Sequence, residues 1–255
     1  MSSSPDRPPA AGSPRRAAQL ADLVRAAPGA VRVQPLYLAG QRLWLKRAET
    51  RLPLRQRLQK GDPGRALRAE IEGLRFMARH GLPSPEILSS GPEMLVTGDA
   101  GAPLYLLFEP DAGAQAHERE LALASAMRGL AALHAAGGRH GRPKLRDICW
   151  DGKQARLIDF ERFRAPARPR DMALDWLILL HSLLEIERDA TPLFVQTAKV
   201  WLDRAPAPAI RAARRQLRLL RLLGPALRPL ARLRPHNKEI MALLALPSAL
   251  GAVLP

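Results

Sequence analysis

The sequence predicts an α+β protein in which short strands precede a larger set of helices. In the first 110 residues, hydrophobic residues alternate with polar ones or form short runs separated by proline and glycine. From residue 117 onward, they recur at the three- and four-residue spacing of amphipathic helices. The hydrophobic fraction, 47% of 255 residues, is large enough to bury a substantial core.

The first part of the chain is expected to form a small lobe over residues 17–110. Its clearest strand is 42–47, because Leu43 and Leu45 alternate with Trp44 and Lys46. Residues 1–16, rich in Ser, Pro and Ala, are expected to be a disordered tail. The other expected elements are helices at 17–27 and 65–80 and strands at 31–33, 35–38, 86–89, 94–97 and 104–108.

The remainder is expected to form a helical lobe over residues 111–208 and a basic helical extension over residues 209–255. The longest amphipathic helix, 117–136, ends at two glycines. A charged loop at 140–149 and a short strand at 156–160 follow it. Further helices are expected at 171–187, 192–202, 210–223 and 237–246, with Pro225 and Pro229 breaking the third of them.

Composition limits the classes of partner and compartment. The chain has 40 Lys and Arg against 24 Asp and Glu, a net charge of 40 − 24 = +16, which favours anionic partners. Its one cysteine, Cys149, cannot form an intramolecular disulfide, as expected in a reducing compartment. The first 16 residues lack the apolar stretch of a secretory signal. We therefore expect a cytoplasmic protein.

Two charged segments in the second half of the chain contain the candidate functional residues. The first runs from His140 through Arg142 to Asp147, and the second is Asp159-Phe160-Glu161. Asp159 lies between two apolar residues at the end of a strand, an unusual place for a carboxylate that is merely solvated. Carboxylate oxygens are the protein ligands that Mg²⁺ prefers, so Asp147 and Asp159 are candidate metal ligands.

These segments resemble the catalytic loop and metal-binding Asp-Phe pair of protein-kinase-like phosphotransferases. His140 matches the loop histidine, Asp147 stands at the position of the metal-binding asparagine, and Asp159 matches the metal-binding aspartate. The stretch Gly81-Leu-Pro-Ser-Pro85 is most similar to bacterial lipopolysaccharide core (Kdo/heptose) kinases and related small-molecule kinases. The resemblance implies a bilobal protein-kinase-like fold that uses ATP and Mg²⁺.

The resemblance also implies roles for residues outside the two segments. Lys46 and the helix residue Glu70 would hold the phosphates of ATP, and Glu109 would lie on the strand that meets the adenine. His140 and Asp171 would be structural, with Asp171 holding the backbone of the loop.

One departure leaves two functions open. Arg142 stands where the family has its catalytic aspartate, and arginine cannot accept a proton at neutral pH. The first hypothesis is a phosphotransferase acting on a sugar hydroxyl of lipopolysaccharide core or a related envelope glycolipid. The second is a catalytically inactive pseudokinase that binds nucleotide or a protein partner.

The basic segment 210–234 also has two interpretations. Its interleaved arginines and leucines are typical of a helix lying on an anionic membrane, which would make the protein peripheral at the inner membrane. Alternatively, its leucines pack on the helical lobe and its arginines are solvated. Nucleic-acid binding is disfavoured, because aromatic residues make up only 4% of the chain and offer no platform for stacking bases.

Overall fold

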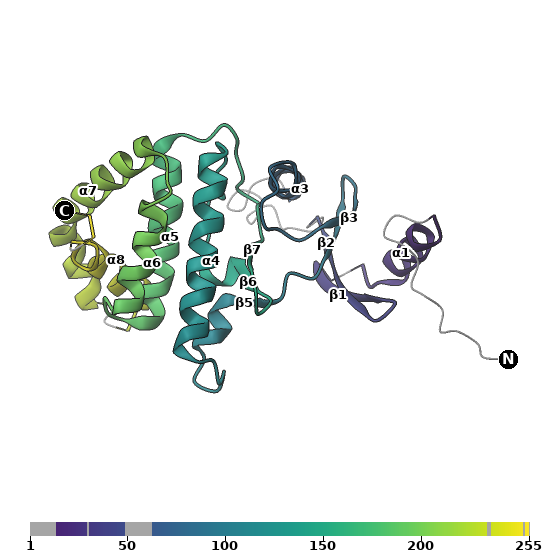
Figure 1. The fold of residues 1–255 in the computed structure, drawn as a ribbon, viewed down its shortest axis with the longest axis horizontal. Helices are drawn as coiled ribbons and strands as arrows, with labels where there is room; N and C mark the ends of the chain where they lie inside the picture. The colour runs from purple at the N-terminus through teal and green to yellow at the C-terminus, as the bar shows by residue number, and fades with distance from the viewer. Residues whose placement is uncertain (1–13, 30, 49–62, 234–235, 252, 255) are drawn as a thin grey trace. The chain divides into compact units, whose positions relative to one another are not determined.

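The computed structural model describes residues 14–29, 31–48, 63–233, 236–251 and 253–254 (Figure 1). The chain divides into two compact units: residues up to Arg68 with Glu86–Asp99 form the first, and Ala69–Pro85 with Ala100–Pro255 the second. The first unit is built around an antiparallel sheet, and helices dominate the second. The α+β class expected from the sequence is confirmed.

The sheet of the first unit has the strand order β1-β2-β4-β3, with every pair antiparallel. Its strands are β1 (Val33–Leu38), β2 (Gln41–Arg47), β3 (Ile87–Ser90) and β4 (Met94–Gly98). Pro35 was expected to interrupt the first strand, but β1 continues through it. Because β1 lies at the edge of the sheet, the missing N–H of Pro35 can face away from the ladder at no cost.

The turn between β1 and β2 consists of only two residues. Ala39 and Gly40 both have positive φ, 50° and 75°, as a type I′ hairpin turn requires. The backbone twist of this turn matches that of the strands it joins, so β1 and β2 are connected as tightly as two strands can be.

Helix α1 (Pro14–Ala26) covers one face of this sheet. Its buried residues Leu20 and Val24 belong to one hydrophobic cluster with sheet residues Leu36, Leu38, Leu43, Leu45 and Val96. The Arg47 guanidinium donates a hydrogen bond to the carbonyl of Val24 at 2.8 Å, which satisfies a carbonyl in the last turn of the helix. Of the expected tail at 1–16, residues 1–13 lie outside the described residues and 14–16 begin α1.

The second unit contains a small sheet of order β5-β6-β7, formed by β5 (Ala102–Pro103), β6 (Ile148–Trp150) and β7 (Ala155–Leu157). Helix α3 (Pro63–Arg79) ends within this unit. The expected strand at 104–108 is wrong: Leu104–Phe108 forms a 3-10 helix, η1. Five hydrophobic residues in a row have no periodicity, so the sequence could not distinguish a strand from a helical turn there.

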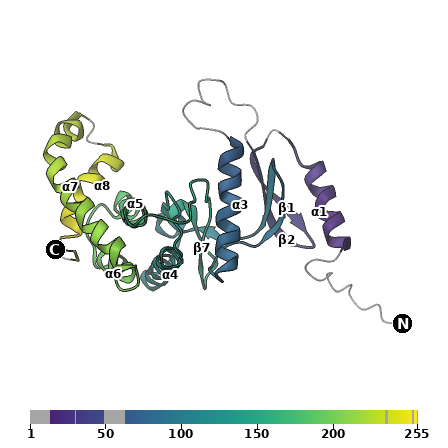
Figure 2. The ribbon, with the colours of Figure 1, turned by 90° about the horizontal axis from the view of Figure 1, so that it is seen from above.

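Five helices complete the second unit: α4 (Ala116–Ala135), α5 (Pro169–Glu187), α6 (Pro192–Leu202), α7 (Ala207–Leu233) and α8 (Lys238–Ala249). Trp176 of α5 stacks on Trp201 of α6 with ring centroids 4.9 Å apart. Helices α7 and α8 contact each other and α5 (Figure 2). No described helix has a stretch both long and apolar enough to cross a membrane.

Helix α7 does not end at residue 223 as expected but continues through Pro225 and Pro229. Each proline removes a backbone N–H and leaves the carbonyl one turn earlier without its helical partner. Both prolines are exposed, so water can satisfy those carbonyls and the helix continues.

Leu20→Ala in α1 is expected to loosen the sheet of the first unit. Removing a buried leucine side chain costs roughly 2–5 kcal/mol, and here the lost contacts are those between helix and sheet. Amide hydrogen exchange of the peptides covering β1 and β2 should accelerate. Gln19→Ala changes an exposed neighbour on the same helix and should leave the exchange unchanged. Equal exchange in the Leu20 variant and the wild type would show that α1 does not stabilise the sheet.

Candidate metal centre

The hairpin β6–β7 brings the two expected metal ligands to the same end of the small sheet. Ile148 pairs with Leu157, so Asp147 precedes the hairpin at the end where Asp159 follows it. The Ile158 N–H donates to the Asp147 carbonyl at 3.0 Å and extends the pairing by one bond. A loop was expected in place of β6, and this strand is the geometric reason that Asp147 and Asp159 are neighbours.

Asp159 adopts a left-handed backbone conformation, with φ 64°. Aspartate tolerates this region better than most residues, and residues held there are concentrated at functional sites. The next residue, Phe160, is completely buried and packs against Gly73 of α3. A Cβ atom on Gly73 would lie 2.6 Å from the Cβ of Phe160, so this approach requires glycine.

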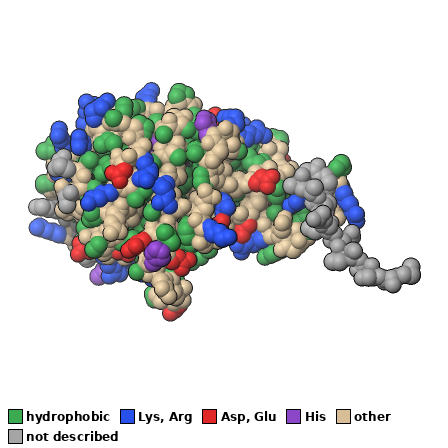
Figure 3. Space-filling view, viewed as in Figure 1, with side chains coloured by type: hydrophobic (Ala, Val, Ile, Leu, Met, Phe, Trp, Pro, Cys, Tyr) green, Lys and Arg blue, Asp and Glu red, His purple; other side chains and the backbone are tan. Residues whose placement is uncertain are grey.

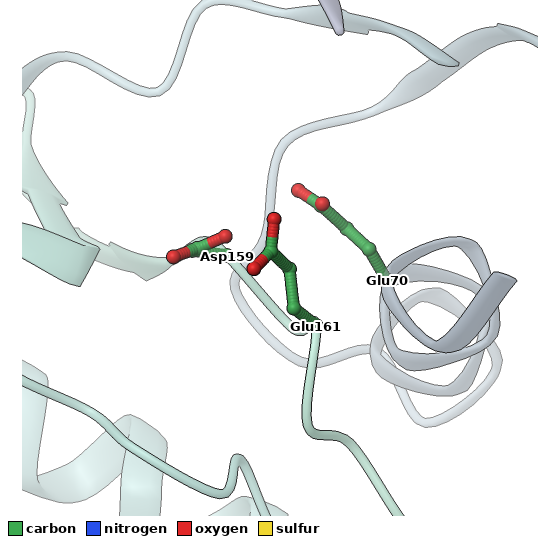
Figure 4. Close-up of side chains that lie close together, drawn as sticks. All are labelled: Glu70, Asp159 and Glu161. Atoms are coloured by element: carbon green, nitrogen blue, oxygen red, sulfur yellow. The ribbon is translucent and has the colours of Figure 1, made fainter. Parts of the chain in front are cut away.

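Three carboxylates converge at this turn: Glu70, Asp159 and Glu161, each offering an oxygen within 4.8 Å of the others (Figure 4). Glu70 is buried on α3 one turn before Gly73, so both residues occupy the helix face that meets Phe160. Asp159 and Glu161 are half-buried. Packing of Phe160 on Gly73 thus places the carboxylate of α3 beside those of the turn.

Asp147 lies outside this group, although its charge interacts with that of Asp159. Its side chain is buried and accepts a hydrogen bond from the Lys144 N–H at 3.2 Å. Burial, followed by the neighbouring negative charge of Asp159, raises the pKa of Asp147 above its ordinary value. Of the two expected metal ligands, Asp159 belongs to this group of three and Asp147 lies beside it, so metal binding by Asp147 stays a prediction.

The loop before Asp147 is held by Asp175 of α5. Its buried carboxylate accepts hydrogen bonds from the N–H groups of His140 and Gly141, at 2.7 and 2.9 Å. The same carboxylate lies 3.3 Å from Nε2 of His134. Trp201 donates to Nδ1 of His134 at 2.9 Å, so the proton of His134 is on Nε2 and points toward Asp175.

Asp171 was expected to hold this loop, and that expectation is wrong. It lies one turn before Asp175 on the same helix and forms ion pairs with Arg139 at 3.5 Å and Arg170 at 3.7 Å. The sequence offered two aspartates four residues apart on one helix face, and only the packing of α5 shows which one reaches the loop backbone.

His140 and Gly141 connect the loop to the carboxylate turn. Nε2 of His140 lies 2.7 Å from the Ile158 carbonyl, which is the backbone hydrogen bond expected for this histidine. The His140 ring also packs on Phe160, with centroids 4.7 Å apart. At Gly141, with φ 102°, a Cβ atom would lie 2.5 Å from the Cβ of Arg162, so the loop and the turn pack closely.

Three further residues were expected in the site: Arg142, Glu109 and Lys46. The Arg142 side chain is half-buried, and within the described residues it forms no ion pair with Asp147 or Asp159. Glu109 is exposed at the end of the 3-10 helix η1, so the strand on which its adenine contact depended does not exist. Lys46 is half-buried on β2 of the first unit, opposite Val33 and Leu95.

Sequence reasoning missed Glu161 and Asp175. Glu161 was assigned no role from the sequence, although a carboxylate two residues from a candidate ligand is itself a signal. Asp175 is the only acidic residue between Asp171 and Glu185, and the other residues of 172–180 are apolar. A charge that interrupts a helix face buried in the core predicts a polar partner.

No family model matches this chain. A stretch of 173 residues, 67% of the chain, is 28% identical to an uncharacterised protein of Haemophilus influenzae and covers 69% of that protein. Among solved structures, WbdD with a kinase inhibitor is 18% identical over 69% of this chain, with a TM-score of 0.47. A structure of WbdD described as a bifunctional kinase-methyltransferase is also 18% identical, with a TM-score of 0.44. The chain spans 44% and 43% of the two WbdD chains.

Gly73→Ala is expected to separate α3 from the carboxylate turn. Replacing glycine by alanine within a helix ordinarily stabilises it by about 1 kcal/mol. Here the new methyl group would overlap Phe160, so the thermal midpoint should fall. Gly129→Ala in α4 is the matched control, because nothing outside that helix lies within 4 Å of the new Cβ. A midpoint raised equally by both substitutions would contradict the close contact.

Asp147→Asn is expected to raise the thermal midpoint at neutral pH in the presence of a chelator. Because the folded-state pKa of Asp147 is raised, its contribution to stability is complete at low pH and is lost as the pH rises through that pKa. Asparagine keeps the hydrogen bond from Lys144 without the charge. The midpoints of variant and wild type should converge as the pH falls below about 4, the ordinary range of an aspartate.

Asp151→Asn is a control that should change the thermal midpoint in the opposite direction. Burial would raise the pKa of Asp151, but hydrogen bonds from the Gln154 N–H, the Arg156 side chain and the Lys153 N–H lower it to about 2. Its ionised form therefore stabilises the fold above the ordinary pKa and loses this effect as the pH falls toward 2. This substitution should lower the midpoint at neutral pH. If both variants shifted the midpoint in the same direction, the charge balance described above would be wrong.

Proposed function

We propose that this chain is an ATP- and Mg²⁺-dependent phosphotransferase acting on a sugar hydroxyl, with lipopolysaccharide core or a related envelope glycolipid as the acceptor class. The observation that carries the proposal is the turn at Asp159. Its left-handed backbone directs a carboxylate into the group with Glu70 and Glu161, at the end of a hairpin whose other end residue is Asp147. The resemblance to kinases at His140, Asp147 and Asp159 supports it.

The carboxylate group suits Mg²⁺ by its chemistry. All three side chains offer oxygen ligands, and the half-buried Asp159 and Glu161 keep a side open to water and to phosphate. Two of the members lie on one turn, and the third is supplied by a helix whose position depends on the Phe160 contact. Bound there, Mg²⁺ would neutralise charge on the phosphates of ATP.

The remaining roles belong to residues of this chain. We propose that Asp159 and Glu161 hold the metal, with Glu70 as a third carboxylate, and that Lys46 binds the α- and β-phosphates. Asp147 fits a second metal-facing position, because burial and then the charge of Asp159 raise its pKa, and a nearby cation would favour its ionised form. His140 and Asp175 are positioning residues that hold the loop and the turn together.

Arg142 supports a second candidate, a pseudokinase that binds nucleotide without transferring phosphate. Arginine cannot act as a general base, and the tight Ala39-Gly40 turn leaves no glycine-rich loop between β1 and β2 to cover phosphates. Phosphoryl transfer, however, depends mainly on positioning and charge stabilisation, so the loss of the base does not by itself abolish turnover. A half-buried guanidinium could instead bind a phosphate or an acidic acceptor.

The nucleotide site is tested by thermal melting with and without ATP and Mg²⁺. Ligand at about one hundred times its dissociation constant stabilises a protein by about 2.7 kcal/mol, which corresponds to several degrees in a chain of this size. The shift should require Mg²⁺ and disappear in Asp159→Asn. Asp111→Asn, an exposed aspartate in a turn, should keep it. A shift that persists in Asp159→Asn would remove Asp159 from the site.

Transfer of label from γ-labelled ATP to a lipopolysaccharide-core extract separates the two candidates. A phosphotransferase should label the extract in the wild type, lose the label in Asp159→Asn, and retain or increase it in Arg142→Asp. A pseudokinase should give the Mg²⁺-dependent melting shift with no label in the wild type. No shift and no label together would overturn both candidates.

A further inference from the structure

We propose that the outer face of α7 is a docking surface for an anionic lipid bilayer. Two stripes run along this helix on opposite sides. Ala209, Ala213 and Leu217 recur every four residues and are buried, at 0–1% exposure, where α7 packs against α5 and α8. The other stripe faces solvent.

The outward stripe combines basic and aliphatic side chains. Arg211, Arg215, Arg218 and Leu222 follow one another at the three- and four-residue spacing that places them on one face, and all are exposed. Leu222 is 78% exposed, and its neighbours Leu219 and Leu223 are 54% and 48% exposed. In the space-filling view, basic and hydrophobic side chains are interspersed over the end of the molecule that carries α7 (Figure 3). Leucines this exposed cost free energy in water, and a bilayer would cover them.

The positive charge of α7 indicates that its partner is negatively charged. Residues 207–233 include seven arginines and no Asp or Glu. Within the described part of the chain, Arg211, Arg215 and Arg218 form no ion pair with an acidic side chain. Like charges spaced three and four residues apart repel one another, so an anionic partner would stabilise the helix.

A bilayer fits this combination better than the other anionic partners. The exposed apolar residues are leucines on a convex helix, which hydrocarbon chains can surround without a matching groove. The helix has no aromatic residue on which a nucleobase could stack. Since no described helix can cross a membrane, the proposed mode is binding in the plane of the interface.

The test is flotation of the full-length protein with vesicles of phosphatidylcholine alone or with about one third phosphatidylglycerol. We expect binding to the anionic vesicles only, and weaker binding as salt shortens the range of the attraction. Each arginine near an anionic surface contributes roughly a fivefold factor in partitioning, so the triple variant Arg211→Gln, Arg215→Gln, Arg218→Gln should bind on the order of one hundredfold less. Leu219→Ser with Leu222→Ser should also weaken binding, which charge attraction alone would not predict.

A charge-matched control removes three positive charges from exposed positions elsewhere in the second unit: Arg79→Gln, Arg128→Gln and Lys153→Gln. It should bind nearly as well as the wild type. The proposal is overturned if the control loses as much binding as the α7 variant, if both vesicle types bind equally, or if the protein binds a DNA duplex and neither vesicle. A melting curve of each variant shows whether it is still folded. The salt dependence of vesicle binding by the wild type tests the charge attraction without any substitution. The melting shift caused by ATP and Mg²⁺ is measured without vesicles. Failure of vesicle binding would therefore overturn the docking surface and leave the proposed phosphotransferase function untouched.

Discussion

The second unit depends on a buried negative charge, the carboxylate of Asp175. A carboxylate in an apolar core is tolerated only where hydrogen bonds replace its lost hydration, and here two backbone N–H groups and the His134 ring supply them. Trp201 in turn determines which nitrogen of His134 carries the proton. Through this network, three helices, α4, α5 and α6, set the position of the loop from His140 to Asp147, and everything else in the candidate site is placed relative to that loop.

The site itself combines a rigid scaffold with a concentration of negative charge. Phe160 is completely buried between His140 and Gly73, so the turn that carries Asp159 and Glu161 has little freedom to move away from α3. Three carboxylates therefore remain within 4.8 Å of one another although their charges repel, and burial together with the charge of Asp159 raises the pKa of the neighbouring Asp147. Such an arrangement is unfavourable for the isolated fold and favourable for binding a cation, as expected where a protein gives up stability for function.

Helices α5 and α8 also hold the loop from His140 to Asp147, through ion pairs with Lys144. Lys144 forms ion pairs with Glu185 of α5 at 3.4 Å and Glu239 of α8 at 3.0 Å, so a loop residue is linked directly to the last helix of the chain. The hydrogen bond from Lys144 lowers the pKa of Glu239. Because α8 also packs against α7, the proposed lipid-facing helix and the candidate site belong to one connected set of helices.

Local pattern in the sequence was sufficient for most of the fold. The alternation at Leu43 and Leu45, the helical periodicity after residue 117 and the odd position of Asp159 each depend on a few neighbouring residues, and each led to a correct element or to the turn of the site. Where the pattern had no period, as in Leu104–Phe108, it failed. Only the tertiary structure decided that Asp175 and not Asp171 holds the loop, and that Glu70 joins Asp159 and Glu161. Those choices depend on how separate helices pack, and contacts between residues far apart in the chain leave no periodic trace in a single sequence.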